Sequence, residues 1–139
     1  MQGVPFAHRL RVRYGECDPQ GIVFNANYLL CVDVAFTELW REAVGPWLEM
    51  TERGYDAVVA ETRLAFKAPA RFDDEIAIGM TIAHLGRASI RTELAIRRGE
   101  ELLVEGELRH VVVSAETWTS TEMPAFIRDG LSPYSSGDS

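Results

Sequence analysis

The residues most suited to chemistry lie in one short stretch, ECDPQGIVFNANYL, at positions 16–29. Asp18 is followed by Pro19 and Gly21, which favour a tight turn, and Asn25 begins what reads as the start of a helix. A carboxylate beside a substrate can act as a general base or as a nucleophile. The N–H groups at a helix N-terminus can stabilise negative charge that develops on an oxygen. The stretch therefore contains the parts of a site in which an acid acts next to a helix entrance.

A long helix is predicted directly after this stretch. Between about 25 and 43, apolar residues recur at helical spacing and form one stripe: Leu29, Val32, Phe36, Leu39 and Ala43. Further apolar residues widen this stripe until it covers nearly the whole circumference of the helix. A helix that is apolar on most sides is buried. Gly45-Pro46 ends it, and a short helical piece follows at about 46–53.

The rest of the chain alternates between apolar and polar residues, which is typical of strands. The predicted strands cover 8–14, 57–69, 74–86, 87–98 and 101–117. Short links between them indicate antiparallel neighbours. We therefore expect an α+β fold in which an antiparallel sheet of about five strands wraps around one long central helix. One domain spans 1–139, with a helical turn within 123–131 and a frayed tail from about 131.

Composition excludes several classes of function. The 139 residues carry 14 basic and 21 acidic side chains, a net charge of −7, which argues against nucleic acid or an anionic membrane as partner. Cys17 and Cys31 form neither a metal spacing nor a disulfide framework, and the three histidines are far apart. No signal core or membrane-spanning run is present. These features predict a soluble, cytoplasmic protein without a metal.

The outer face of such a sheet would be mixed, with apolar positions among polar ones. A second copy of the chain would cover those positions. We therefore expect a homo-oligomer with a dimer as its minimal unit and a homotetramer as the assembly.

The order of elements, together with YGECDPQGIVFNANYL at 14–29, resembles the hotdog-fold acyl-CoA thioesterases, with the 4-hydroxybenzoyl-CoA thioesterase branch as the nearest likeness. The similarity runs from about Arg11 to Val113 and includes ERG at 52–54 and ARFDDEIAI at 70–78. The resemblance implies hydrolysis of an aromatic or short acyl-CoA to free acid and CoA. Coenzyme A would be part of the substrate, and no separate cofactor is implied.

The resemblance also assigns roles to the residues of the stretch. Asp18 matches the catalytic acid, as nucleophile or general base. The backbone N–H of Asn25, or that of a neighbouring residue, matches the group that polarises the thioester carbonyl. From the residues themselves, we expect Gly21 to shape the turn that holds Asp18 against the helix entrance, and Phe24 to help to bury the loop and exclude water. The plain alternatives are a turn aspartate that bonds its own backbone and an asparagine that only caps a helix.

Three further residues match substrate contacts of that branch. Asp33 matches a residue that contacts the ring hydroxyl of the substrate, with an ion pair or hydrogen bond inside a dimer as the alternative. Trp47 matches a tryptophan of the acyl pocket, with core packing as the alternative. Arg87 is the only match to a basic triplet that binds CoA phosphates, a departure that weakens the predicted CoA docking.

Other functions remain open at this point. The same fold could serve as a non-catalytic acyl-CoA-binding module, or as a thioesterase acting on an acyl carrier protein. A hotdog hydratase is disfavoured because no histidine lies within 16–29. A serine-type thioesterase is disfavoured because the chain lacks a G-x-S-x-G elbow.

Overall fold

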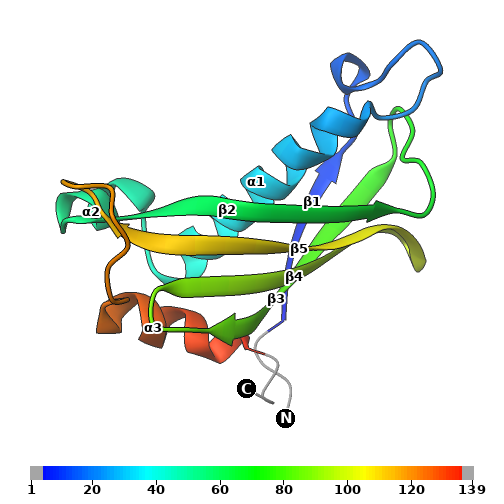
Figure 1. Ribbon diagram of the computed structural model, residues 1–139. Helices are drawn as coiled ribbons and strands as arrows, with labels where there is room; N and C mark the ends of the chain where they lie inside the picture. The colour runs from blue at the N-terminus through cyan, green and yellow to red at the C-terminus, as the bar shows by residue number, and fades with distance from the viewer. Residues whose placement is uncertain (1–4, 136–139) are drawn as a thin grey trace.

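Five antiparallel strands curve around one long helix in the computed structural model, which describes residues 5–135 (Figure 1). The strands follow the sheet order β1-β3-β4-β5-β2. Their bounds are β1 Phe6–Arg11, β2 Tyr55–Phe66, β3 Glu75–Leu85, β4 Ser89–Arg98 and β5 Glu101–Ser114. The predicted α+β hotdog arrangement is confirmed.

The central helix α1 spans Asn25–Ala43, which are the bounds expected from the apolar spacing. Its inner side packs into the curve of the sheet, where Ala35, Leu39 and Trp40 are fully buried. Two shorter helices, α2 (Trp47–Glu52) and α3 (Ala125–Leu131), lie at the end of the sheet where α1 finishes (Figure 1).

The outer side of α1 is open in the single chain. Leu30 is 64% exposed, Leu29 49% and Val34 47%. The expectation of a helix buried nearly all round is therefore wrong for one chain taken alone. Apolar spacing marks residues that avoid water, but it does not say whether their own chain or another surface covers them.

The pairing of β2 departs from the order of strands along the chain. β3, β4 and β5 follow one another as antiparallel neighbours, as predicted, but β2 pairs with β5 instead of β3. The connection 67–74 crosses from β2 at one edge of the sheet to β3, beside β1 at the other edge. That connection passes the start of α1, and it is this crossing that brings it next to residues 16–24.

The C-terminal segment is docked where a frayed tail was expected. Ser132–Tyr134 form a 3-10 helix, and Ser135 bridges to Ile82 of β3. The Tyr134 hydroxyl donates a 2.7 Å hydrogen bond to Glu42 of α1. This contact ties the end of the described chain to the central helix; the rest of the predicted tail, 136–139, lies outside the described residues.

Candidate active site

The Asp18 loop is a tight turn that fixes the carboxylate. The N–H of Gly21 donates to the Asp18 carbonyl at 2.9 Å, and the N–H of Gln20 donates to Oδ1 of the Asp18 side chain at 2.8 Å. Gly21 has φ +80°, a left-handed conformation that favours glycine. The carboxylate does bond its own backbone, as the plain alternative proposed. Within residues 5–135 its other oxygen has no protein donor, so the turn orients the acid and leaves one oxygen free for chemistry.

The connection 67–74 clamps this loop against α1. The N–H of Val23 donates to the Ala70 carbonyl at 2.9 Å. The N–H of Ala70 in turn donates to the Tyr28 hydroxyl at 3.0 Å. Burial raises the pKa of Tyr28, although the bond from Ala70 opposes this, so the phenol stays protonated. Loop, connection and helix are thus held as one unit.

Burial of the loop differs from the expectation. Val23 is only 3% exposed and Ile22 is partly buried, but Phe24 is 53% exposed. The expectation that Phe24 is buried in the loop is wrong for the single chain. Its ring lies at the surface, beside the helix entrance.

The first turn of α1 lacks a capping side chain. Phe24 occupies the N-cap position, which makes Asn25 the first helical residue, so Asn25 is not the helix cap. The side chain of Asn27 instead donates to the Glu16 carbonyl at 2.8 Å. Among residues 5–135 no acceptor within the chain bonds the backbone N–H of Asn25 or Ala26. These N–H groups, at the positive end of the helix dipole, are free to bind an oxygen of a ligand.

Glu16 is the second carboxylate near this turn, and it is held by Arg13. Its two oxygens accept hydrogen bonds from Arg13, one from the backbone N–H at 2.7 Å and one from the guanidinium at 2.9 Å. Burial raises the pKa of Glu16, but these bonds outweigh it and lower the pKa below its usual value. Each oxygen of the ionised Glu16 therefore has a donor, whereas one oxygen of Asp18 has none within residues 5–135.

The structure places the other predicted residues at different points along the fold. Asp33 is exposed on α1, about two turns beyond Asn25. Trp47 lies beyond the far end of α1, where its indole donates to Asp56 at 3.1 Å and packs on Trp40. Arg87 lies in the turn between β3 and β4, at the end of the sheet opposite the Asp18 loop (Figure 1). One chain thus brings together Asp18, Gly21, Phe24 and Asn25, and separates them from Trp47 and Arg87.

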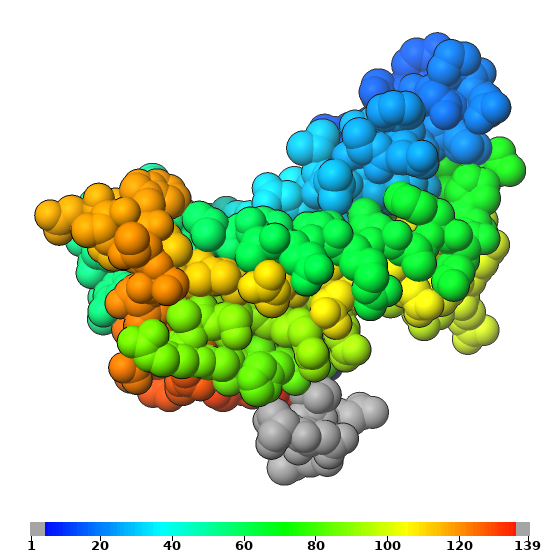
Figure 2. Space-filling view, viewed as in Figure 1, coloured from blue at the N-terminus to red at the C-terminus, as the bar shows by residue number. Residues whose placement is uncertain are grey.

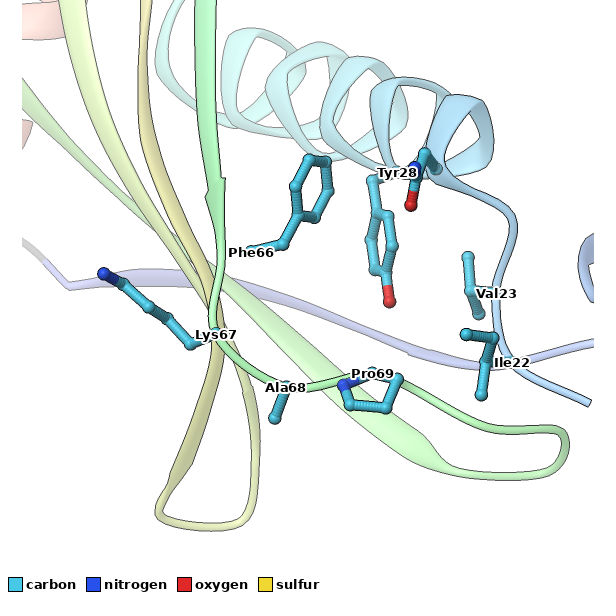
Figure 3. A pocket seen from close by; sticks show the side chains of 8 residues that line it. Ile22, Val23, Tyr28, Phe66, Lys67, Ala68 and Pro69 are labelled. Carbon is cyan, nitrogen blue, oxygen red and sulfur yellow. The ribbon is translucent and has the colours of Figure 1, made fainter. Parts of the chain in front are cut away.

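A cavity of about 290 Å³ opens beside the start of α1 (Figure 3). Its lining runs from Ile22, Val23 and Asn25 to the end of β2 and the start of the connection. Tyr28 and Phe66 form one wall, with ring centroids 5.4 Å apart. Lys67 contributes to the lining, but its amine points away from the cavity and pairs with Glu105 at 3.6 Å.

Sequence reasoning missed Tyr28, Phe66 and Lys67 as parts of this site. Tyr28 lies within the stretch 16–29, and Lys67 is the only lysine of the chain, yet neither fact indicates that residues 66–69 return to residue 25. Only the pairing of β2 with β5 brings the end of β2 to the helix entrance.

No group of three or more His, Cys, Asp or Glu residues suited to a metal ion occurs among residues 5–135. Within the same residues, no helix combines the length and the apolar character that a membrane crossing needs. Both cysteines are free thiols.

In the space-filling view, the loop and the start of α1 project from one end of the molecule (Figure 2).

Comparisons with known proteins show what this chain is similar to. Acyl-CoA thioester hydrolase YbgC of Escherichia coli is 28% identical over 109 residues, which cover 78% of this chain and 81% of that protein. The BH1999 gentisyl-coenzyme A thioesterase structure is 25% identical, with a TM-score of 0.82 over 91% of this chain and 99% of that one. Slr0204, a 1,4-dihydroxy-2-naphthoyl-CoA thioesterase from Synechocystis, shares the fold at 16% identity, with a TM-score of 0.84 over 92% of this chain and 96% of that one.

A family model described as the thioesterase-like superfamily matches residues 12–131, which include the Asp18 turn, the whole of α1 and four of the five strands. The chain therefore belongs to the thioesterase-like superfamily.

Proposed function

We propose that this thioester hydrolase acts on the CoA thioester of an aromatic or short acyl group, with Asp18 as its catalytic carboxylate. One observation carries the proposal. The Asp18 turn is clamped directly beside a helix N-terminus whose first N–H groups have no partner within residues 5–135. Similarity to a protein named an acyl-CoA thioester hydrolase supports the CoA thioester as substrate class.

The two parts of the site divide the reaction between them. The thioester oxygen accepts a hydrogen bond from the N–H of Asn25, which stabilises the negative charge that develops there. Asp18 then acts in one of two ways. As a nucleophile it adds to the carbonyl carbon and expels the CoA thiolate, leaving an anhydride that water hydrolyses. As a base it takes a proton from the water that attacks, and the thiolate leaves and is protonated. Both routes give the free acid and CoA.

We further propose that a second copy of the chain completes the site. Leu29, Leu30 and Val34 form an exposed apolar row on α1, and β2 next to it is an unpaired edge of the sheet. Pairing through this region would cover the row and would bring another subunit close to the helix entrance. Arg87 is too far from Asp18 within one chain, so a contact with CoA phosphates would come from another subunit. The proposed assembly is a dimer, and two dimers would form the expected tetramer.

The test is thiol release from a panel of CoA thioesters by wild type and by Asp18→Asn. The panel holds benzoyl, 4-hydroxybenzoyl, phenylacetyl, acetyl, hexanoyl and palmitoyl-CoA. We expect wild type to turn over the aromatic or short members and Asp18→Asn to lose at least 100-fold in kcat. Asp73→Asn is the matched control, because Asp73 is a surface acid of the neighbouring connection and its φ of +71° suits asparagine.

Three results would contradict the proposal. Full activity of Asp18→Asn would remove Asp18 from the reaction. Absence of turnover by wild type, combined with a rise in melting temperature on adding acyl-CoA, would favour a binding module. Release from an acyl carrier protein alone would favour the carrier-protein thioesterase.

A further inference from the structure

The connection 67–74 touches both halves of the proposed reaction centre. At the turn that holds the acid, the N–H of Phe72 donates to the Gly21 carbonyl at 3.4 Å. At the helix entrance, the carbonyl of Ala70 accepts a hydrogen bond from the N–H of Val23 at 2.9 Å. The distance between the proposed catalytic carboxylate and the first N–H groups of α1 therefore depends on where this connection lies.

Arg98, the last residue of β4, holds the connection in place. Its guanidinium donates to the Pro69 carbonyl at 3.3 Å and to the Asp74 carboxylate at 2.5 Å. The same carboxylate oxygen accepts a hydrogen bond from the N–H of Arg71 at 2.8 Å. These bonds fix the connection on both sides of Ala70, the residue that binds the helix entrance.

The guanidinium of Arg98 is itself fixed by a second acid. Its other amino group donates to Glu101 of β5 at 2.6 Å, and the bonds with Glu101 and Asp74 raise the pKa of Arg98. Burial raises the pKa of Asp74, but the bonds from Arg71 and Arg98 outweigh it and lower the pKa below its usual value. Both partners are therefore charged at pH 7. A planar guanidinium can bind several oxygens at once, which the single amine of a lysine does not reproduce.

The place of Arg98 in β4 distinguishes it from an arginine that only keeps a surface soluble. Leu94 and Ile96, at the alternate positions before it, face the core and are buried, so Arg98 continues the inward side of the strand. A charged side chain on that side needs partners. Arg97 lies on the exposed side, and among the described residues its guanidinium bonds only the Glu100 carbonyl, at 3.3 Å.

We infer that Arg98 is a positioning residue of the reaction, which fixes the connection and thereby sets the Asp18 carboxylate against the N–H of Asn25. The inference rests on the proposed function, because it takes these two groups as the ones that carry out the hydrolysis. Arg98 does not line the cavity beside α1, so it acts through the connection. A misplacement of reacting groups by about 1 Å can cost about 100-fold in rate.

The test measures kcat and KM of Arg98→Gln with the CoA thioester of the earlier panel that wild type turns over fastest. We expect kcat to fall by about 10-fold or more while KM changes by less than about 3-fold, because a displaced carboxylate weakens the transition state rather than substrate binding. Arg98→Lys keeps the charge without the planar fork and should recover part of the loss. Arg97→Gln is the matched control on the exposed side of the same strand, and should keep the wild-type kcat.

Asp74→Asn tests whether Arg98 acts through the connection. This change removes the charge that the guanidinium binds, so kcat should fall as it does in Arg98→Gln. The double variant should be no slower than the slower single variant, since both changes release the same contact. Losses that multiply in the double variant would overturn the proposed route through Asp74.

Two readouts separate positioning from stabilisation of the fold. Kinetics are measured at a temperature at which circular dichroism shows each variant to be folded. In NMR spectra, the amide signals of Gly21 and Val23 should shift in Arg98→Gln and stay in place in Arg97→Gln. A residue that only stabilised the fold would lower the melting temperature without changing kcat of the folded enzyme.

The outcomes distinguish the two proposals. A wild-type kcat in folded Arg98→Gln, or an equal loss in Arg97→Gln, would overturn the role of Arg98 and leave the thioesterase proposal intact. If Arg98→Gln does not fold, a wild-type kcat in Asp74→Asn would overturn that role in the same way. Failure of wild type to hydrolyse any thioester of the earlier panel would overturn the thioesterase proposal, and the role of Arg98 with it.

Discussion

His110 should make the stability of the protein depend on pH in a window of its own. Burial lowers its folded-state pKa from 6.5 to about 4. Between these values the unfolded chain binds the proton more readily, so the free energy of unfolding falls as the pH falls. Above pH 6.5 this loss is absent. Each unit of pH within the window costs about 1.4 kcal/mol, so lowering the pH from 6.5 to 5 should cost about 2 kcal/mol.

Urea unfolding at fixed protein concentration measures this dependence, with His110→Phe as the comparison. The variant should lose most of the slope between pH 5 and pH 6.5. The other lowered pKa values belong to Glu16 and Asp74, whose ordinary values are 4.5 and 3.8, so their effects lie at lower pH. An equal slope in both proteins would show that His110 is not buried as a neutral ring.

The start of α1 allows a test of one backbone N–H group. Asn25 is the first helical residue, a position that tolerates proline because its N–H has no partner in the helix. Phe24 before it has ψ 138°, a conformation that also suits a following proline. Asn25→Pro should therefore fold normally while lacking the proposed donor to the thioester oxygen.

We expect Asn25→Pro to reduce kcat by about 100-fold or more, the cost of losing one such donor. Asn25→Ala keeps the N–H and should retain most of the activity, which separates backbone from side chain. The melting temperatures of both variants report whether the helix is intact. Equal activity of the two variants would assign the polarising group to another residue, with the N–H of Ala26 as the next to test.

At the scale of elements, the spacing of apolar residues predicted the helix and strands that form from residues close together in the sequence. The helix at 25–43 was predicted with its bounds because its apolar spacing and the Gly45-Pro46 stop are local signals. The pairing of β2 with β5 was not predicted, because alternation reveals which face of a strand is buried but not which strand lies beside it. The cavity wall formed by Tyr28 and Phe66 depends on that pairing.

In the candidate site, too, residues close together in the sequence were predicted and a distant residue was missed. Asp18, Gly21 and Asn25 lie within eight residues, and the structure brings them together as expected. Arg98, which bonds the connection beside these residues, was missed because one arginine among the charged residues of a hairpin gives no spacing to interpret. Its position two residues after Ile96, on the inward side of β4, is the signal that identifies it as an arginine in need of partners.

At the scale of the whole molecule, the exposed row on α1 predicts an assembly that one substitution can break. Leu30 is 64% exposed in the single chain, so Leu30→Glu should leave the chain's own core intact. A charge buried in the proposed interface would be costly without a partner. We therefore expect Leu30→Glu to be monomeric in sedimentation velocity at concentrations where wild type is a dimer or tetramer.

Activity should fall together with the assembly, because the proposed site needs a second subunit to supply Arg87. Leu48→Glu is the matched control: Leu48 is 77% exposed on α2, away from the row, and its substitution should preserve both assembly and turnover. Circular dichroism checks that the sheet and helices persist in both variants. A monomeric wild type with full turnover would contradict the shared site, whereas loss of activity on dissociation, with the fold retained, would mean that the enzyme's functional unit is the assembly.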